Sequence, residues 1–276
     1  MIISINGLRF SYSSAPVLEN ITADLCGPKF ISILGPNGVG KSTLIHCINK
    51  ILKPTGGTVM IDDRNVDEIT IKEMAKMIGY VPYSANDTFP LSVVDTVLMG
   101  RHPHSKWKSL DSDLDIVYDT LKMLGIEDLA MRSFNELSAG QHQKVMLARG
   151  LAQEPQILLL DEPTSNLDVR HQIDVAKMLK RLSVEKQILV IMICHDINIA
   201  AKYSDEIMLL SAGSIYAMGT PEEVITEENL RAVYGVTSHV IMDEGSPHVI
   251  LRDSISEKED RVDIPSSDSL AVEETQ

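Results

Sequence analysis

The stretch "GPNGVGKST", Gly35 to Thr43, decides the fold of this chain. It matches the pattern GxxxxGK[ST], follows the apolar run "FISIL" at 30–34 and opens the helical pattern "STLIHCINKIL" at 42–52. Glycines let such a loop turn tightly, so that successive backbone N–H groups point into one concavity at a helix N-terminus. The stretch therefore predicts a P-loop that binds the phosphates of a nucleotide.

Two side chains of this loop have specific expected roles. Lys41 brings a positive charge to the β- and γ-phosphates, and the hydroxyl of Ser42 is placed to ligate Mg²⁺. ATP and Mg²⁺ are therefore the expected cofactors. We expect the whole loop to contact the nucleotide, through Gly35, Pro36, Asn37, Gly38, Val39, Gly40, Lys41, Ser42 and Thr43.

Two further apolar runs end in polar residues suited to hydrolysis. The run "ILLLDEP" at 157–163 places Asp161 and Glu162 at the end of a buried strand, and "QILVIMIC" at 187–194 is followed by His195. Ligands of α/β sheets gather at the carboxyl ends of the strands. We expect Asp161 to hold Mg²⁺ indirectly or through a water, Glu162 to polarise the attacking water, and His195 to sense the γ-phosphate. The predicted catalytic residues are Lys41, Glu162 and His195, and the predicted metal site is Ser42 with Asp161.

The motif "LSAGQ", Leu137 to Gln141, predicts a second helix N-terminus that suits a phosphate. Ser138 is the expected N-cap, and Gly140 allows close backbone approach. One chain with two such sites suggests that they meet across a two-fold axis. We therefore expect a homodimer in which each ATP lies between the P-loop of one subunit and the "LSAGQ" motif of the other.

The periodicity of the remaining sequence indicates an α/β fold with a largely parallel sheet, because strand-like runs alternate with helical patterns. From about 86 to 150 the apolar residues have helical spacing and little strand signal, which predicts a helical insertion. The expected strands cover 2–5, 30–34, 58–61, 157–160, 188–193, 206–210 and 214–217.

The net charge of −14 is concentrated toward the end of the sequence. Residues 253–276 hold eight acids against two bases, a net charge of −6, with few large apolar side chains. Such a segment buries too little surface to offset its ordering entropy, so we expect a disordered acidic tail. The acidity of the rest argues against nucleic-acid partners, since these are bound through Lys and Arg.

The apolar runs are too short to cross a bilayer, so we expect neither a membrane span nor direct insertion into lipid. The start, "MIISINGLRF", alternates like a strand and lacks the pattern of a secretion signal, which favours the cytoplasm. The widely spaced Cys26, Cys47 and Cys194 suit small buried hydrophobes. His102 and His104 lack further ligands nearby, so surface or partner contacts are expected of them.

The order and spacing of "GPNGVGKST", "LSAGQ", "LLLDEP", the "SNLD" loop at 165–168 and His195 resemble those of the nucleotide-binding subunits of ATP-binding cassette (ABC) transporters. The resemblance extends from residue 2 to about 252. It implies a P-loop NTPase (RecA-like) core, an N-terminal antiparallel β part and an inserted α-helical subdomain. It also implies that the dimer closes on two MgATP, that Tyr12 stacks on adenine, and that nucleotide is contacted by Ser138, Gly140, Gln141 and Asp168.

Two positions depart from the family pattern. "LSAGQ" carries Ala139 where family members usually have glycine, a change of one methyl group. In "GYVPYSAND" at 79–87, Tyr83 replaces an expected glutamine that in related proteins contacts Mg²⁺ and the attacking water. A phenol is a poor ligand for this hard cation, so we expect Tyr83 to face the membrane partner and Ser84 to be a candidate hydroxyl on the nucleotide side.

Several stretches also resemble the subunits that power uptake of iron chelates, haem or vitamin B12: "VLMGRHPH" at 97–104, 194–210, 219–236 and "GSPHVI" at 245–250. Molybdate, zinc and manganese importers have similar cassettes. Such a subunit would lie peripherally at the cytoplasmic face of the membrane. It would be held by two integral-membrane permease subunits and, through them, would serve an extracytoplasmic substrate-binding protein.

A different class is a cassette ATPase that serves DNA repair, translation or cofactor assembly. Cassettes that act on DNA usually carry long heptad insertions or basic faces, whereas here 94 residues separate Thr43 from Ser138 and the core is acidic. Transport is therefore favoured. A scaffold without turnover is opposed by Glu162 and His195, which are both present.

Overall fold

The protein is described here by a computed structural model that covers residues 1–13, 15–83, 91–104, 110–165 and 167–255. Its centre is a six-stranded sheet in which β3, β6, β7, β8 and β9 run parallel and β10 is an antiparallel edge strand. This arrangement confirms the expected α/β fold. In spatial order the strands are β10 (Ser214–Gly219), β9 (Glu206–Ser211), β3 (Lys29–Leu34), β8 (Leu189–Ile193), β7 (Ile157–Leu160) and β6 (Ile78–Val81).

Alternate residues of the central strands enter two different hydrophobic clusters, because successive side chains of a strand point to opposite faces. Phe30 and Leu158 belong to one cluster, which also contains residues of the helices between 93 and 203. Ile31 and Leu159 belong to the other, which contains the N-terminal strands and the P-loop helix. The sheet is therefore covered on both faces, which explains why its strands read as continuous apolar runs.

A second sheet, of four antiparallel strands, confirms the antiparallel β part. The first strand continues well beyond the expected end at residue 5, across a bulge beside Gly7, whose φ is 58°. The second strand was not expected from the sequence. In spatial order they are β2 (Pro16–Cys26), β1 (Ile2–Ser11), β4 (Gly56–Ile61) and β5 (Arg64–Asn65).

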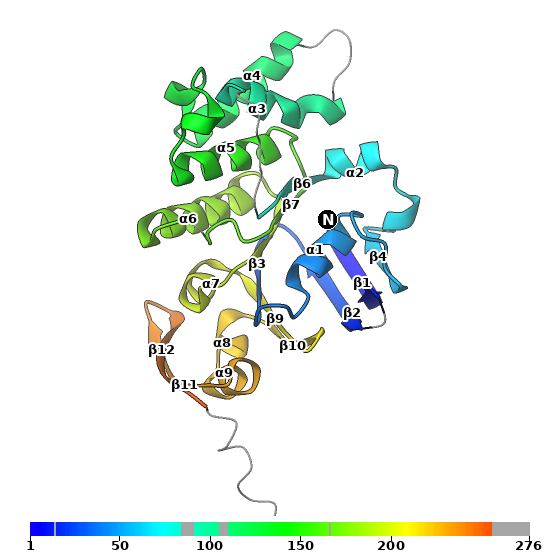
Figure 1. Ribbon diagram of the computed structural model, residues 1–276, viewed down its shortest axis with the longest axis vertical. Helices are drawn as coiled ribbons and strands as arrows, with labels where there is room; N and C mark the ends of the chain where they lie inside the picture. Colours follow the sequence, from blue (N-terminus) through cyan, green and yellow to red (C-terminus); the bar gives the residue numbers. More distant parts are fainter. Residues whose placement is uncertain (14, 84–90, 105–109, 166, 256–276) are drawn as a thin grey trace, which may run out of the picture.

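In Figure 1 the helices between residues 93 and 151 form the upper end of the molecule, and the antiparallel sheet lies at mid-height, to the right of the central sheet. The described part of the predicted insertion, 86–150, contains α3, α4, most of α5 and three short 3₁₀ helices. The α-helices are α1 (Lys41–Ile48), α2 (Ile71–Met77), α3 (Val93–Leu98), α4 (Leu110–Met123), α5 (Ala139–Leu151), α6 (Val169–Glu185), α7 (Ile197–Tyr203), α8 (Pro221–Val224) and α9 (Glu227–Tyr234). The 3₁₀ helices are η1 (Val66–Glu68), η2 (Met99–His104), η3 (Glu127–Leu129) and η4 (Phe134–Glu136).

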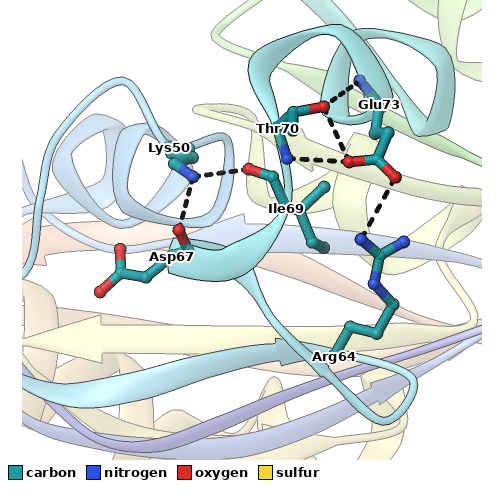
Figure 2. Close-up of polar contacts among 6 residues, drawn as sticks. All are labelled: Lys50, Arg64, Asp67, Ile69, Thr70 and Glu73. Carbon is teal, nitrogen blue, oxygen red and sulfur yellow. Dashed lines mark hydrogen bonds and ion pairs between the residues drawn. The ribbon is translucent and has the colours of Figure 1, made fainter.

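A polar network ties the end of the P-loop helix to the segment that precedes the edge strand β6 (Figure 2). The ammonium of Lys50 donates to the carbonyl oxygens of Asp67 and Ile69, at 2.9 and 2.6 Å. Thr70 and Glu73 then form a reciprocal capping box at the start of α2. These contacts fix α2, and hence the entry to β6, relative to the P-loop.

A β-hairpin follows α9 and packs against α7, through Asn198, whose amide exchanges hydrogen bonds with the backbone of Val249. Its strands are β11 (Val236–Asp243) and β12 (Ser246–Ser254). Asp253 and Ser254 therefore belong to the hairpin rather than to the expected tail, because they pair with the start of β11. The rest of the expected tail, 256–276, lies outside the described residues. Among the residues described, no helix is both long and apolar enough to cross a membrane.

Candidate nucleotide site

The P-loop has the predicted context, between the end of β3 and the start of α1. Two of its glycines are required by the backbone. Gly40 precedes the first residue of α1 at a φ of 103°, and Gly35 has a φ of 144°. A Cβ atom at Gly35 would lie 2.4 Å from the carbonyl oxygen of Leu210, which is closer than atoms can approach. The loop therefore needs glycine for both conformation and space.

The side chain of Lys41 is buried and folds back across the loop. Its Nζ donates hydrogen bonds to the carbonyl oxygens of Gly35 and Pro36, at 2.7 and 2.8 Å. Burial lowers the pKa of Lys41, while the carboxylates of Glu162 and Asp161 act in the opposite direction. The ammonium of Lys41 is therefore partly desolvated and held at the loop, and a bound phosphate would neutralise its charge there.

The two residues of the predicted magnesium site lie together. Ser42 Oγ donates a hydrogen bond of 2.9 Å to Asp161 Oδ1. Burial is the main cause that raises the pKa of Asp161, and the hydrogen bond from Ser42 opposes it. A hydroxyl and a carboxylate oxygen at the end of β7 are donors of the type that Mg²⁺ prefers, so the residues present fit this cation.

Glu162 and His195 are in direct polar contact, with His195 Nε2 2.7 Å from Glu162 Oε1. Glu162 occupies the left-handed region of the backbone, with a φ of 51°, which is uncommon for a residue that has a side chain. Such strain at the end of a strand is typical of functional sites. The structure thus brings together two residues that the sequence placed at the ends of two strands, at one edge of the sheet.

Lys41, Ser42, Glu162 and His195 line one cleft of about 460 Å³. Asp161 does not line this cleft and is linked to it through its hydrogen bond with Ser42. Val17, which the sequence analysis did not assign, also lines it. Predicted residues in its walls are Tyr12, Asn37, Gly38, Gly40, Lys41, Ser42, Thr43, Glu162 and His195. Of the other predicted loop residues, Val39 is part of the hydrophobic core, and Gly35 and Pro36 hold Lys41.

Tyr12 lies at the rim of the cleft with 66% of its surface exposed. Its hydroxyl is 3.5 Å from Thr43 Oγ1, and its ring packs edge to face on Phe10 with the centroids 4.9 Å apart. The ring is therefore positioned by a neighbour and still has a free face. This geometry suits the stacking on adenine that the family resemblance implies.

The "LSAGQ" motif forms the start of α5, as predicted. Ser138 and Gln141 cap each other: Gln141 N donates to Ser138 Oγ at 3.4 Å, and Ser138 N donates to Gln141 Oε1 at 3.1 Å. A Cβ atom at Gly140 would lie 2.9 Å from the ring of His171. None of these motif residues lines the cleft of the same chain. The expected meeting of motif and P-loop across a dimer stays a prediction.

Asp168 caps α6 by accepting hydrogen bonds from the backbone N–H of His171 at 2.9 Å and from its ring Nδ1 at 2.8 Å. It too lies outside the cleft walls. Ser165, in the same loop, donates a hydrogen bond to the carbonyl oxygen of Glu162 at 3.1 Å. Asn166 and the candidate hydroxyl Ser84 lie outside the described residues.

Sequence reasoning missed a pair of residues beside Asp161 of the predicted magnesium site. His46 Nε2 is 2.9 Å from the hydroxyl of Tyr80 and 4.0 Å from Asp161 Oδ2. Burial raises the pKa of Tyr80 to about 12, so its phenol is neutral. His46 follows Ser42 by four residues, and the shared helix face was the signal available in the sequence. The proximity of His46 to Asp161 arises only when the strands assemble into the sheet, so it could not be predicted from the sequence.

Comparisons with known proteins show which family the chain belongs to. A family model described as "ABC transporter" matches residues 18–165. An uncharacterized ABC transporter ATP-binding protein of Methanocaldococcus jannaschii is 48% identical, over 91% of this chain and 98% of that protein. The ferric enterobactin transport ATP-binding protein of Escherichia coli K12 is 36% identical over 88% of this chain and 91% of that protein. The hemin import ATP-binding protein of E. coli O157:H7 is 35% identical over 90% of this chain and 99% of that protein.

Solved structures give the same result. An inward-facing metal-chelate type ABC transporter matches with a TM-score of 0.80 and 29% identity, over 91% of this chain and 97% of that chain. A dimeric bacterial ABC transporter cassette matches with a TM-score of 0.70 and 29% identity, over 79% of this chain and 98% of that chain. The strand order, the inserted helices and the P-loop are therefore those of a known architecture.

Proposed function

Because the chain belongs to the ABC transporter family as an ATP-binding cassette, we propose that it is the ATP-hydrolysing motor of an import system for a metal chelate: an iron siderophore, haem or a cobalamin-type compound. Relatives named for ferric enterobactin transport and hemin import support this class of cargo. The cargo itself would bind other subunits. The observation that carries the proposal is the convergence of Lys41, Ser42, Glu162 and His195 on one cleft.

The geometry supports a specific division of roles. Lys41 would exchange its two carbonyl partners for the β- and γ-phosphates, and Ser42 with Asp161 would hold Mg²⁺. The cation would supply charge neutralisation at the transferred phosphoryl group. Glu162 would accept a hydrogen bond from the attacking water and polarise it, and His195 would hold that carboxylate in place.

The separation of the two phosphate sites supports a homodimer. The "LSAGQ" motif lies outside the cleft of its own chain, so a second copy would have to complete each site. We also propose that residues 1–252 and the hairpin end act as one ATPase domain, which includes the helical insertion near 86–150. Two membrane permease subunits would hold the dimer at the cytoplasmic face and link it to an extracytoplasmic binding protein.

A co-purification experiment tests the transport assignment. The tagged chain is isolated from detergent-solubilised membranes of its source cells, with the protein carrying Lys41→Ala as a matched bait that keeps its outer surface. Recovery of a polytopic apolar protein with both baits supports a transporter motor. Recovery of a DNA-repair, translation or cofactor-assembly protein, with no polytopic partner, contradicts it.

A further inference from the structure

A second cavity, of about 250 Å³, shares Glu162 with the nucleotide cleft. Glu162 is the lining residue that the two cavities have in common. The second cavity is bounded by three segments: Tyr83 after β6, one face of α5, and the loop after β7. The helix that carries "LSAGQ" and the predicted catalytic carboxylate of the same chain therefore share a common space.

The face of α5 that borders this cavity carries an unsatisfied donor. Gln143 Nε2 is buried and has no hydrogen-bond partner among the described residues. A buried N–H without an acceptor is costly, and such a group in a native fold indicates either an unseen partner or a second conformation that satisfies it. Gln143 lines the cavity together with Tyr83 and Ser165.

Tyr83 offers the acceptor that suits this donor. It is half exposed, so part of its ring reaches the surface and part lines the cavity. A phenol oxygen accepts as well as donates. The Ser165 hydroxyl, which donates to the carbonyl oxygen of Glu162, keeps its acceptor lone pairs and is the alternative acceptor that the experiment has to separate from Tyr83. Tyr83, which follows β6, and the helix α5 both border the cavity. A hydrogen bond between them would fix both relative to Glu162.

We propose that Tyr83 and Gln143 are paired positioning residues: the Tyr83 hydroxyl accepts the Gln143 amide proton in the hydrolysing state and sets the position of Glu162 relative to α5. The inference rests on the proposed ATPase function. It gives the tyrosine a role within the chain that needs no metal coordination. Neither side chain contacts the nucleotide cleft, so the pair acts on turnover through Glu162 and leaves substrate binding alone.

A double-mutant cycle on the full chain tests the pairing. Tyr83→Phe removes only the hydroxyl, and Gln143→Met keeps an unbranched side chain without the amide. Each variant is expected to lower kcat about fivefold and to change the KM for MgATP less than about twofold, and the double variant is expected to be no slower than the slower single variant. Tyr118→Phe, an exposed tyrosine on α4, and Gln156→Leu, an exposed glutamine before β7, are the matched controls.

Three results would overturn the proposal. The first is an additive loss of kcat in the double variant, and the second is a change confined to KM. The third is that Gln143→Met is non-additive with Ser165→Ala and additive with Tyr83→Phe, which would assign the acceptor to Ser165. Single-turnover hydrolysis after MgATP binding, measured with thermal unfolding, separates slow chemistry from misfolding. If the wild-type chain itself does not hydrolyse MgATP, the proposed function fails; if it hydrolyses normally and the cycle is additive, only this inference fails.

Discussion

The imidazole of His195 and the carboxylate of Glu162 are joined at 2.7 Å, although they come from the ends of two different strands, β7 and β8. The two strands are parallel neighbours, and both residues follow a fully buried run. The contact holds the predicted water-activating carboxylate at the edge of the nucleotide cleft. It also means that Glu162 has to share its oxygens between His195 and a water when ATP is bound.

Replacing Lys41 by alanine should abolish tight ATP binding, with a loss of at least about a hundredfold in affinity, because the charge and its fit to the phosphates are lost together. The fold should survive, since the lysine's partners in the described structure are loop carbonyls that water can satisfy. Isothermal titration with ATP checks this, with thermal unfolding as the control. An unchanged affinity in a folded variant would remove the P-loop assignment.

Replacing Asp161 by asparagine should separate stability from function. Burial raises the pKa of Asp161, so ionising this carboxyl costs folding free energy. An acid whose pKa is raised in the folded state stabilises the fold in its protonated form. That contribution to the free energy of unfolding is present at low pH and is lost as the pH rises through the folded-state pKa. At neutral pH the neutral amide should therefore raise the Tm of the nucleotide-free protein, while Mg²⁺-dependent hydrolysis falls at least about tenfold.

A Tm comparison across pH is the direct check on this assignment. The advantage of Asp161→Asn over the wild type should shrink as the pH falls toward the range where the carboxyl becomes protonated. A Tm that is lower in the variant at neutral pH would show that the ionised carboxylate stabilises the apo fold.

Truncation after Ile255 should leave ATPase activity within about twofold, since a segment with little apolar surface adds little to a folded core. The cut is placed after β12, because Asp253 and Ser254 pair with the first residues of β11. Steady-state ATPase assays of the truncated and full chains give the comparison. A large loss or gain would identify the tail as a working part.

Replacing Tyr83 by alanine should leave MgATP affinity within about threefold, under ~1 kcal/mol, because Tyr83 lies outside the nucleotide cleft. Its half-exposed ring is available to the membrane partner, so stimulation of ATPase by the assembled transporter should weaken. The isolated subunit and the reconstituted complex are assayed side by side. A variant that loses ATP binding but retains normal stimulation would place Tyr83 in the nucleotide site.

The parts of the fold that were readable from the sequence are those set by local patterns. Ser138 was recognisable as an N-cap and Gly140 as a close-contact position, because both depend on neighbours a few residues away. The P-loop was recognisable for the same reason. The run that became β7 was equally clear, since both of its faces are buried and it reads as continuous apolar sequence.

Strands whose apolar pattern is interrupted could not be predicted from the sequence. Strand β2 contains Asn20 with a φ of 56°, which shifts the pairing and breaks the alternation of apolar and polar residues. Strand β6 has four residues and includes Gly79, where a Cβ atom would lie 2.7 Å from the carbonyl oxygen of Gly150. The contact of His46 with Tyr80 joins α1 to β6, and only the assembled sheet places them together.

The most direct test of the account is the size and nucleotide content of the Glu162→Gln variant in MgATP, measured by light scattering after gel filtration. Glutamine keeps the shape of the side chain but cannot act as a base, so ATP should bind without being hydrolysed. We expect a stable dimer of 30.5 kDa subunits that retains ATP, whereas the wild type should return to monomers as it hydrolyses ATP. A variant that stays monomeric in MgATP, or that turns over near the wild-type rate, would contradict the roles assigned to Glu162 and to the dimer.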